Sequence, residues 1–556
     1  MSSIALVASS HIDTFARDHL PPPSQWPQFI FDRSEVTYPD FLNATHELLD
    51  ANVIQGKGLN PALHGRSALG ESFTWTYSNL LEKVDSIAHV LTKELGLVAG
   101  NRLLLRGGNS PMMAACFLAG IKAGLVMVPT MPLLRANELS KIIEKAQINV
   151  ALCASNLAQE LDHCLDPAHP KFNSKLKKVI HFSSSDPHGL EALMQKHQNK
   201  FESHPTSKDD VCLIAFTSGT TGEPKGTMHF HRDILAMCDL FPRHILEMNS
   251  NDIVCGTPPI AFTFGLGGLL AFPLRYGASS ILIEKHTPTS LLQTISTYRA
   301  TQCYTAPTFY RQMADLADAF DLTSIRHPVS AGEALPNAIR ELWRKKTGLE
   351  ITDGIGGTEL IHIYIASAGR QVRQGAIGQV VPGYRAQIVD ENMQPVPPGT
   401  MGKLAVKGPT GCRYLSDPRQ KDYVKNGWNL PGDTFVMDSD GYFSYVARND
   451  DMIISSGYNI AGPEVESVLL LHPAVAECGV VGTPDEERGQ IVTAFISLKA
   501  EFSAGPQLAE QLQEFVKQNI APFKYPRRIE FLPELPRTET GKLQRFRLRE
   551  LANNLK

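Results

Sequence analysis

The stretch VCLIAFTSGTTGEPKG, residues 211–226, indicates both the fold class and the chemistry of the chain. Its first six residues are all apolar, as in a strand buried on both faces, and a loop rich in glycine and hydroxyl groups follows at once. In such a loop Gly219 and Gly222 let main-chain N–H groups turn inward, and Lys225 supplies charge. We therefore expect a phosphate-binding loop, formed by Thr217, Ser218, Gly219, Thr220, Thr221, Gly222 and Lys225. A flexible surface turn is the alternative.

The spacing of the loop differs from that of P-loop NTPases, because two residues rather than four separate Gly219 from Gly222.

Strand and helix patterns alternate on both sides of the loop. The periodicity predicts strands at 101–106, 125–129, 279–284 and 328–330, and helices at 111–123, 135–146 and after Pro336. This alternation predicts an α/β fold with doubly wound mixed or parallel sheets.

A change of texture near residues 427–441, which are polar and rich in glycine and aspartate, predicts a domain boundary. We place it at RNDD, residues 448–451, which divides the chain into a large N-terminal domain, 1–449, and a small domain, 450–556. In the second part, helical spacing around 508–516 and a strand pattern at 491–498 predict a compact α+β unit, and the family resemblance described below implies that it is mobile.

Composition excludes several classes of protein. With 556 residues, 43% of them hydrophobic and 20% charged, the chain is expected to be globular with two or more domains. A net charge of -4 gives no general attraction to nucleic acid or to an anionic membrane. Nine cysteines without a Cys-x-x-Cys pair, and no signal peptide, favour a cytoplasmic location. The apolar run 112–134 is interrupted by Lys122 and two prolines, so we expect a buried helix and strand there.

Four further segments accompany the loop in the same order as in a known family: IGGTE at 355–359, GD at 432–433, RNDD at 448–451 and PRTETGK at 536–542. From about Thr76 to its end the chain thus resembles the adenylate-forming superfamily of acyl-CoA synthetases, peptide-synthetase adenylation domains and luciferases. The segments HIDTFAR at 11–17, MHFHRD at 228–233 and DGIGGTELIH at 353–362 most resemble benzoate- and 2-aminobenzoate-CoA ligases.

The resemblance implies an enzyme that uses ATP and Mg²⁺ to convert a carboxylic acid to its adenylate and then transfers the acyl group to coenzyme A. It assigns Mg²⁺ binding to Glu359, phosphate contacts to Thr358 and Lys225, and catalysis of adenylation to Lys542. Asp433 and Arg448 would bind the ribose, and Asp353 the adenine amino group. The base would be lined by the backbone atoms of Gly332, Glu333 and Ala334, together with Gly354 and Ile355. Ile355 replaces the family's usual aromatic residue, so less stacking energy is expected.

For the second step, the resemblance assigns the hinge to Asp450 and the loop that approaches CoA to Ser456, Gly457 and Tyr458. An acid pocket suited to a flat ring is expected from Phe262, Phe264, Gly265, Ala331, Gly356, Gly357 and His362, with His231 as a further contact. For His362 a core position is equally open, and we expect His229 to pack in the core.

Several alternatives stay open. The acceptor can be the thiol of a carrier protein, the acid can be a medium-chain fatty acid, and a nucleotide sensor without catalysis is a further class. The predicted partners are the acid, ATP and CoA, without nucleic acid or membrane, and a homodimer is left open.

Overall fold

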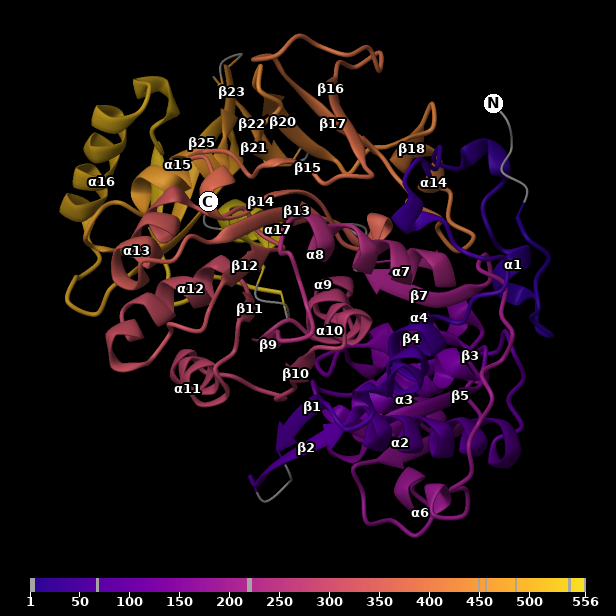
Figure 1. The fold of residues 1–556 in the computed structure, drawn as a ribbon. Helices are drawn as coiled ribbons and strands as arrows, with labels where there is room; N and C mark the ends of the chain where they lie inside the picture. The colour runs from indigo at the N-terminus through magenta and orange to yellow at the C-terminus, as the bar shows by residue number, and fades with distance from the viewer. Residues whose placement is uncertain are drawn as a thin grey trace.

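The computed structural model describes residues 6–66, 70–217, 223–448, 451–455, 458–485, 488–538 and 542–554. Within these ranges the chain forms four sheets (Figure 1). Two are large and mostly parallel, a third is antiparallel, and the fourth belongs to the C-terminal part. This architecture confirms the predicted α/β class with doubly wound sheets.

The phosphate-loop sheet has the order β6-β5-β3-β4-β7-β8. Its neighbours are parallel except for the β7–β8 hairpin. Leu103 and Leu105 face one core and Leu104 faces another, so both faces of the sheet are buried. The strands are β3 (Arg102–Arg106), β4 (Val126–Thr130), β5 (Val150–Ala154), β6 (Lys178–Phe182), β7 (Val211–Thr217) and β8 (Lys225–Phe230).

The second large sheet has the order β15-β14-β13-β12-β11-β9-β10-β1-β2. It is parallel from β1 to β13 and antiparallel at both edges. Its strands are β1 (Pro61–Arg66), β2 (Ser72–Thr76), β9 (Ile253–Gly256), β10 (Ser279–Ile281), β11 (Gln302–Thr305), β12 (His327–Ala331), β13 (Thr352–Gly356), β14 (Ile363–Ser367) and β15 (Gln379–Val380).

Helices cover both large sheets in alternating layers. Between the sheets lies α3 (Pro111–Lys122), which contacts β3 and β4 of the first and β1 of the second, and α2 (Tyr77–His89) packs against α3, β1 and β2. The outer face of the phosphate-loop sheet is covered by α4 (Ala136–Ala146) and α5 (Gln159–Leu165), and that of the second sheet by α11 (Pro288–Tyr298), α12 (Pro307–Ala314) and α13 (Asn337–Thr347). Shorter helices are α1 (Phe15–Asp18), α6 (Leu190–Met194), α7 (His231–Asp239), α8 (Phe241–His244), α9 (Thr263–Leu266), α10 (Phe272–Tyr276) and α14 (Gln420–Tyr423).

Most predicted elements are present, and most of the predicted ends in the two large sheets and their helices differ by a single residue from those observed. The strand predicted over 279–284 is β10, which ends at Ile281, although Leu282 N still donates to His64 O. The helix predicted to open with Pro336 begins one residue later, because Pro336 is in an extended conformation as its N-cap.

The antiparallel sheet follows the second large sheet in the chain. It has the order β18-β19-β17-β20-β21, with β16 beside β17. Its strands are β16 (Arg385–Val389), β17 (Met401–Lys407), β18 (Val424–Lys425), β19 (Trp428–Asn429), β20 (Asp433–Met437) and β21 (Phe443–Arg448). Strand β20 begins and β21 ends with a residue of the predicted ribose site.

The C-terminal sheet has the order β23-β22-β25-β24, with β26 parallel to β25, and it has a core of its own. Its elements are β22 (Met452–Ser455), β23 (Tyr458–Ala461), β24 (Val475–Asp485), β25 (Gly489–Leu498), β26 (Arg528–Phe531), α15 (Gly462–Leu469), α16 (Pro506–Asn519) and α17 (Arg545–Asn554). The predicted helix and strand are α16 and β25. The predicted boundary at 449/450 lies outside the described residues.

The apolar run 112–134 contributes to α3 and β4, both almost entirely buried. Among helices of the described part of the chain, none has both the length and the hydrophobicity needed to cross a membrane. All nine cysteines are free thiols, and only Cys478 is partly exposed. Burial raises the pKa of Cys116, Cys212 and Cys238 well above the usual value of a thiol.

Candidate active site

The phosphate loop joins the two strands of the β7–β8 hairpin, whose last pair is Thr217 with Lys225. Five predicted phosphate-binding residues lie outside the described residues: Ser218, Gly219, Thr220, Thr221 and Gly222. At the described end of the loop, Lys225 Nζ lies 5.5 Å from the centre of the Tyr414 ring. The Tyr414 hydroxyl in turn donates a 2.6 Å hydrogen bond to Oε1 of Glu359. Lys225 and the predicted metal ligand Glu359 therefore both contact Tyr414.

The exit of the loop is clamped by a charged group that sequence reasoning missed. Lys145 Nζ donates to Pro224 O at 3.0 Å, and Arg419 donates to Glu223 O at 3.2 Å. Both cations also bind Asp417, at 2.7 and 2.6 Å. Burial alone would raise the pKa of the Asp417 carboxyl, but these cations hold it well below the usual value. The clamp joins segments that are distant in sequence, so no local sequence pattern predicts it.

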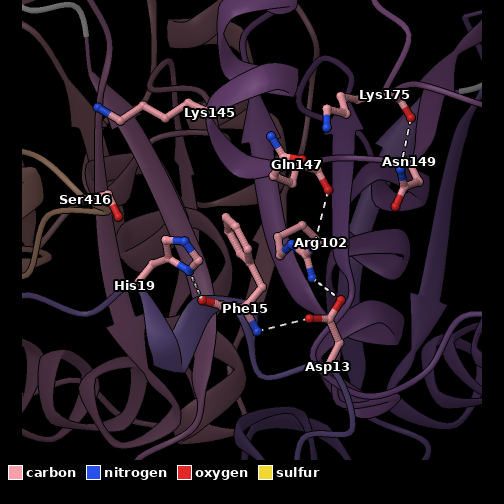
Figure 2. A pocket seen from close by; sticks show the side chains of 9 residues that line it. All are labelled: Asp13, Phe15, His19, Arg102, Lys145, Gln147, Asn149, Lys175 and Ser416. Atoms are coloured by element: carbon pink, nitrogen blue, oxygen red, sulfur yellow. Dashed lines mark hydrogen bonds and ion pairs between the residues drawn. The ribbon is translucent and has the colours of Figure 1, made fainter.

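A hollow of about 530 Å³ lies beside this clamp, and Figure 2 shows its lining. Lys145 and Ser416 line it together with N-terminal residues that include Asp13. None of the predicted site residues that the structure describes lines it. Two of the cations in its lining are paired, since Arg102 binds Asp13 and Lys145 binds Asp417.

Thr358 and Glu359 lie in a short turn, Thr358–Leu360, directly after β13. A methyl group added to Gly357 would lie 3.5 Å from Oε2 of Glu359. Tyr414 occupies Oε1, so Oε2 is the oxygen left for a ligand. Glycine at 354 and 356 is required by the close packing of β14, because added methyl groups would lie 2.8 Å from Ile363 Cδ1 and 2.6 Å from His362 O.

The predicted ribose site is a cross-strand pair. Asp433 at the start of β20 faces Arg448 at the end of β21, and Arg448 Nε lies 3.8 Å from Asp433 Oδ1. Burial raises the pKa of the Asp433 carboxyl to about 6, although Arg448 and Lys542 oppose the rise. Asp353 is buried on β13, with Oδ2 at 3.4 Å from Arg340, and burial raises its pKa to about 7. Next to it, Ile355 is half-buried.

Lys542 of the C-terminal part reaches the predicted nucleotide site of the large part. A methyl group added to Gly332, whose φ is +90°, would lie 3.5 Å from Lys542 Cε. Burial lowers the pKa of this ammonium, and Glu333, Asp433 and Glu359 partly oppose the fall. The loop before it is closed at its base, since Lys542 N donates to Thr538 Oγ1 at 3.0 Å. The predicted catalytic lysine, metal ligand and ribose ligand thus face one another.

The side chain of Glu333, whose main chain is predicted to line the adenine, has contacts of its own. Its Oε1 accepts a 3.1 Å hydrogen bond from Leu543 N and lies 3.6 Å from Arg537. Its side chain therefore holds the lysine loop. Ala331 ends β12, and Ala334 follows in the same turn.

Three aromatic rings surround His362 in the region of the predicted acid pocket. Their centres lie 4.6 Å (Phe272), 5.6 Å (Phe241) and 5.8 Å (Phe264) from that of the histidine ring. Burial lowers the pKa of His362 to about 3, so the ring is neutral near pH 7. Its Nε2 lies 3.4 Å from Phe264 O and must carry the proton, because a carbonyl only accepts. Nδ1 is then an acceptor, buried without a partner among the described residues.

Sequence reasoning missed Phe241 and Phe272, which lack any motif and are recognisable only as apolar core residues. Phe262 is half-buried just before α9, and Gly265 is required by packing, since a methyl group there would lie 2.2 Å from Pro259 O.

Two histidines have contacts that sequence reasoning did not predict, although His229 is fully buried as expected. His229, expected to be a packing residue, lies at the site, where its Nε2 contacts Thr358 O at 2.8 Å. His231, expected at the acid pocket, accepts a hydrogen bond from Ala44 N and lies among groups of the N-terminal segment such as His11. The reason is structural: β8 ends between them, so His231 is the first residue of α7.

The predicted hinge residue Asp450 and the loop residues Ser456 and Gly457 lie outside the described residues. Tyr458 is 55% exposed, and its ring is stacked on that of Phe523 at 4.6 Å.

Comparison with known proteins decides the family. The model of the AMP-binding enzyme family matches residues 52–414, and that of the AMP-binding enzyme C-terminal domain matches 464–542. The chain belongs to the AMP-binding enzyme family. Within this family it is 34% identical to benzoate–CoA ligase of Thauera aromatica, over 92% of this chain and 97% of the relative. It is 32% identical to the human mitochondrial acyl-coenzyme A synthetase ACSM3, over 92% of this chain and 90% of that one.

Solved structures of the family agree. The anthranilate CoA ligase AuaEII, in complex with anthranoyl-AMP, has a TM-score of 0.87 at 30% identity, covering 94% of this chain and 99% of that one. A benzoate CoA ligase from Burkholderia xenovorans LB400 has a TM-score of 0.81 at 31% identity, with 91% and 100% covered. Family and relatives confirm the predicted enzyme class, an AMP-forming acid–CoA ligase. Its co-substrates are ATP and CoA, with Mg²⁺ as the usual ion.

Proposed function

We propose that this acid–CoA ligase acts on an aromatic carboxylic acid of the benzoate or 2-aminobenzoate type. The convergence at Lys542 supports the first step, because the charges of Glu333, Asp433 and Glu359 all act on one ammonium. A carboxylate oxygen of the acid attacks the α-phosphorus of ATP, and the bond to pyrophosphate breaks. Lys542 stabilises the negative charge that develops between acid and phosphate.

Other groups of the chain hold the nucleotide in this step. The loop 217–222 and Lys225 would bind phosphate oxygens, Thr358 would add a hydroxyl, and Asp433 would accept hydrogen bonds from the ribose hydroxyls. The donor set fits Mg²⁺, which takes one or two carboxylates and completes its shell with substrate phosphates and water. Glu359 offers one carboxylate, and no cluster of three or more metal-ligating residues occurs in the described part of the chain. The ion supplies neutralisation of phosphate charge when bound.

The three aromatic rings around His362 support a flat acid as the substrate. Its walls are aromatic rings, and its polar group is the unpaired Nδ1 acceptor of a neutral imidazole. A substrate that carries a hydrogen-bond donor beside its carboxylate, such as the amino group of 2-aminobenzoate, would satisfy this nitrogen. The likeness to a benzoate and an anthranilate ligase supports the same class of acid.

For the second step we propose that the small domain, 450–556, rotates about Asp450. The rotation would withdraw Lys542 and bring Ser456, Gly457 and Tyr458 to the site, where the thiol of CoA attacks the acyl carbon and AMP leaves. The exposed ring of Tyr458 is compatible with this role. The second candidate substrate is a medium-chain fatty acid, favoured by the equally extensive likeness to an acyl-coenzyme A synthetase.

A screen of acids for pyrophosphate release, with and without CoA, tests the proposal. We expect benzoate and 2-aminobenzoate to be turned over faster than hexanoate and octanoate, and 2-aminobenzoate to exceed 2-methylbenzoate, a similar shape without the donor, by at least about 10-fold. His362→Phe should reduce this last ratio toward one. Preference for the aliphatic acids would reject the aryl assignment, and pyrophosphate release without CoA thioester would indicate a carrier-protein acceptor.

A further inference from the structure

The turn that carries Thr358 and Glu359 contains a strained residue. Ile361, with φ +68° and ψ -36°, lies in the left-handed region, which a β-branched side chain disfavours. Conformations of this kind persist where the surroundings hold them in place, and they concentrate at functional sites. Some contact must therefore maintain this turn.

Two side chains from other segments hold the carbonyl groups of the turn. His229 Nε2 donates to Thr358 O at 2.8 Å, and Thr410 Oγ1 donates to Leu360 O at 2.8 Å. Within the turn, Ile361 N donates to the same Thr358 O at 3.1 Å. The bond from His229 thus supports the hydrogen bond that closes the strained turn.

His229 is in turn held by buried charges. Its Nδ1 lies 3.6 Å from Asp233 Oδ2, and Arg413 contacts the same carboxylate. None of these three side chains has any solvent exposure. Burial would raise the pKa of Asp233, but Arg413 and His229 outweigh it and hold the pKa below its usual value, so the carboxylate is ionised. The imidazole therefore has a buried carboxylate on the side opposite to Thr358.

Tyr414, which follows Arg413 in the chain, contacts Glu359, the neighbour of Thr358. Its hydroxyl donates to Glu359 Oε1 at 2.6 Å, while Arg413 acts on Thr358 O through Asp233 and His229. Consecutive side chains of one segment thus fix the main chain at Thr358 and the carboxylate of Glu359.

We propose that His229 is a positioning residue for adenylation. It holds the Thr358 carbonyl, and through this turn it sets the direction of the Thr358 hydroxyl and the Glu359 carboxylate. The inference rests on the roles proposed above for these two residues. His229 need not touch the reacting atoms, and its effect should be specific to the step in which the phosphates of ATP are held.

The test compares His229→Leu, which removes the donor, with His229→Gln, whose amide can still donate to Thr358 O. His89→Leu is the matched control, because His89 is also buried and its ring contacts a main-chain oxygen, Lys200 O, at 3.2 Å. For each full-length variant we would measure the adenylation rate, thioester formation from preformed acyl-adenylate, the melting temperature, and ATP affinity with MgCl₂ by calorimetry.

We expect His229→Leu to lower the adenylation rate about 10- to 100-fold, with a much smaller effect on thioester formation. His229→Gln should recover most of the loss, and His89→Leu should lower only the melting temperature. If His229→Leu keeps the wild-type adenylation rate, or the glutamine variant loses as much as leucine, the proposal is wrong.

Calorimetry separates this test from that of the proposed function. If the wild-type protein adenylates no acid in the screen, the proposed function fails. The positioning role would still be supported if His229→Leu binds ATP with MgCl₂ more weakly than His229→Gln does. Equal affinities of these two variants would overturn it.

Discussion

The main-chain N–H of Leu543 donates a 3.1 Å hydrogen bond to Oε1 of Glu333. The two residues lie 210 positions apart, one in the lysine loop and the other in the turn after β12. Arg537, on the other side of the loop, lies 3.6 Å from the same oxygen. One carboxylate of the large part thus holds both ends of the loop that delivers Lys542.

This contact predicts that Glu333→Ala slows adenylation. Hydrogen bonds to a charged group contribute about 1.5–3 kcal/mol, so the fraction of molecules with the loop docked should fall by about 10-fold or more. Pyrophosphate release would report the loss, and thioester formation from preformed adenylate should be unchanged or faster. Glu477→Ala is the control, because Glu477 binds Arg537 at 3.0 Å within the C-terminal part. Equal effects of the two variants would contradict the prediction.

Lys542→Ala should nearly abolish adenylation. The loss of one preorganised charge at the reacting group costs about 10²–10³-fold in rate. Thioester formation from preformed adenylate should be far less affected, because the lysine is expected to have left the site by then. A matched control is Lys517→Ala, in a partly exposed ion pair on α16. Equal loss in both half-reactions would rule out separate poses for the two steps.

The pKa of Asp433, raised to about 6 by burial, predicts the acid limb of the pH profile. Below this pH the carboxyl is protonated and accepts poorly from the ribose, so kcat/KM for ATP should fall as the pH decreases through about 6. Because the pKa of Lys542 is lowered, the decline of kcat/KM at alkaline pH should begin at a lower pH. Asp433→Asn should have a low kcat/KM without the acid limb. An identical acid limb in wild type and Asp433→Asn would assign that titration to another group.

Lys122 supports the fold away from the site. Its ammonium is fully buried and lies 2.7 Å from Asp50 and 2.5 Å from Asp85. Lys122→Met would remove the buried cation that both carboxylates share, which should lower the free energy of unfolding by about 3–5 kcal/mol. Urea denaturation followed by tryptophan fluorescence would measure it. Lys93→Met, an exposed position, should change it by less than about 0.5 kcal/mol. Similar values for both variants would mean that the pair contributes little.

The strands and helices of the large sheets were predictable because each buried element has its own local pattern. The apolar run 211–216 is buried on both faces of a sheet, and its residues show this without any knowledge of their neighbours. The motif residues Lys225, Glu359, Asp433 and Lys542 were recognisable for a different reason, since glycine and charge recur around them in a fixed order.

The supporting residues were not predictable in this way. Tyr414, Glu333 and Phe272 reach the site through contacts that join distant segments, and such contacts leave no periodicity in the sequence. The histidines at 229 and 231 show the limit most clearly. They are two residues apart, and only the end of β8 between them decides which one meets Thr358.

The burial of the nine cysteines has a consequence for an enzyme whose co-substrate is a thiol. Exchange with a disulfide requires an accessible thiolate, whereas eight of these sulfurs are buried and burial raises the pKa of the partly exposed Cys478. Oxidised CoA should therefore form no mixed disulfide with the folded chain. The enzyme should thus stay active under oxidising conditions that convert its co-substrate CoA to the disulfide.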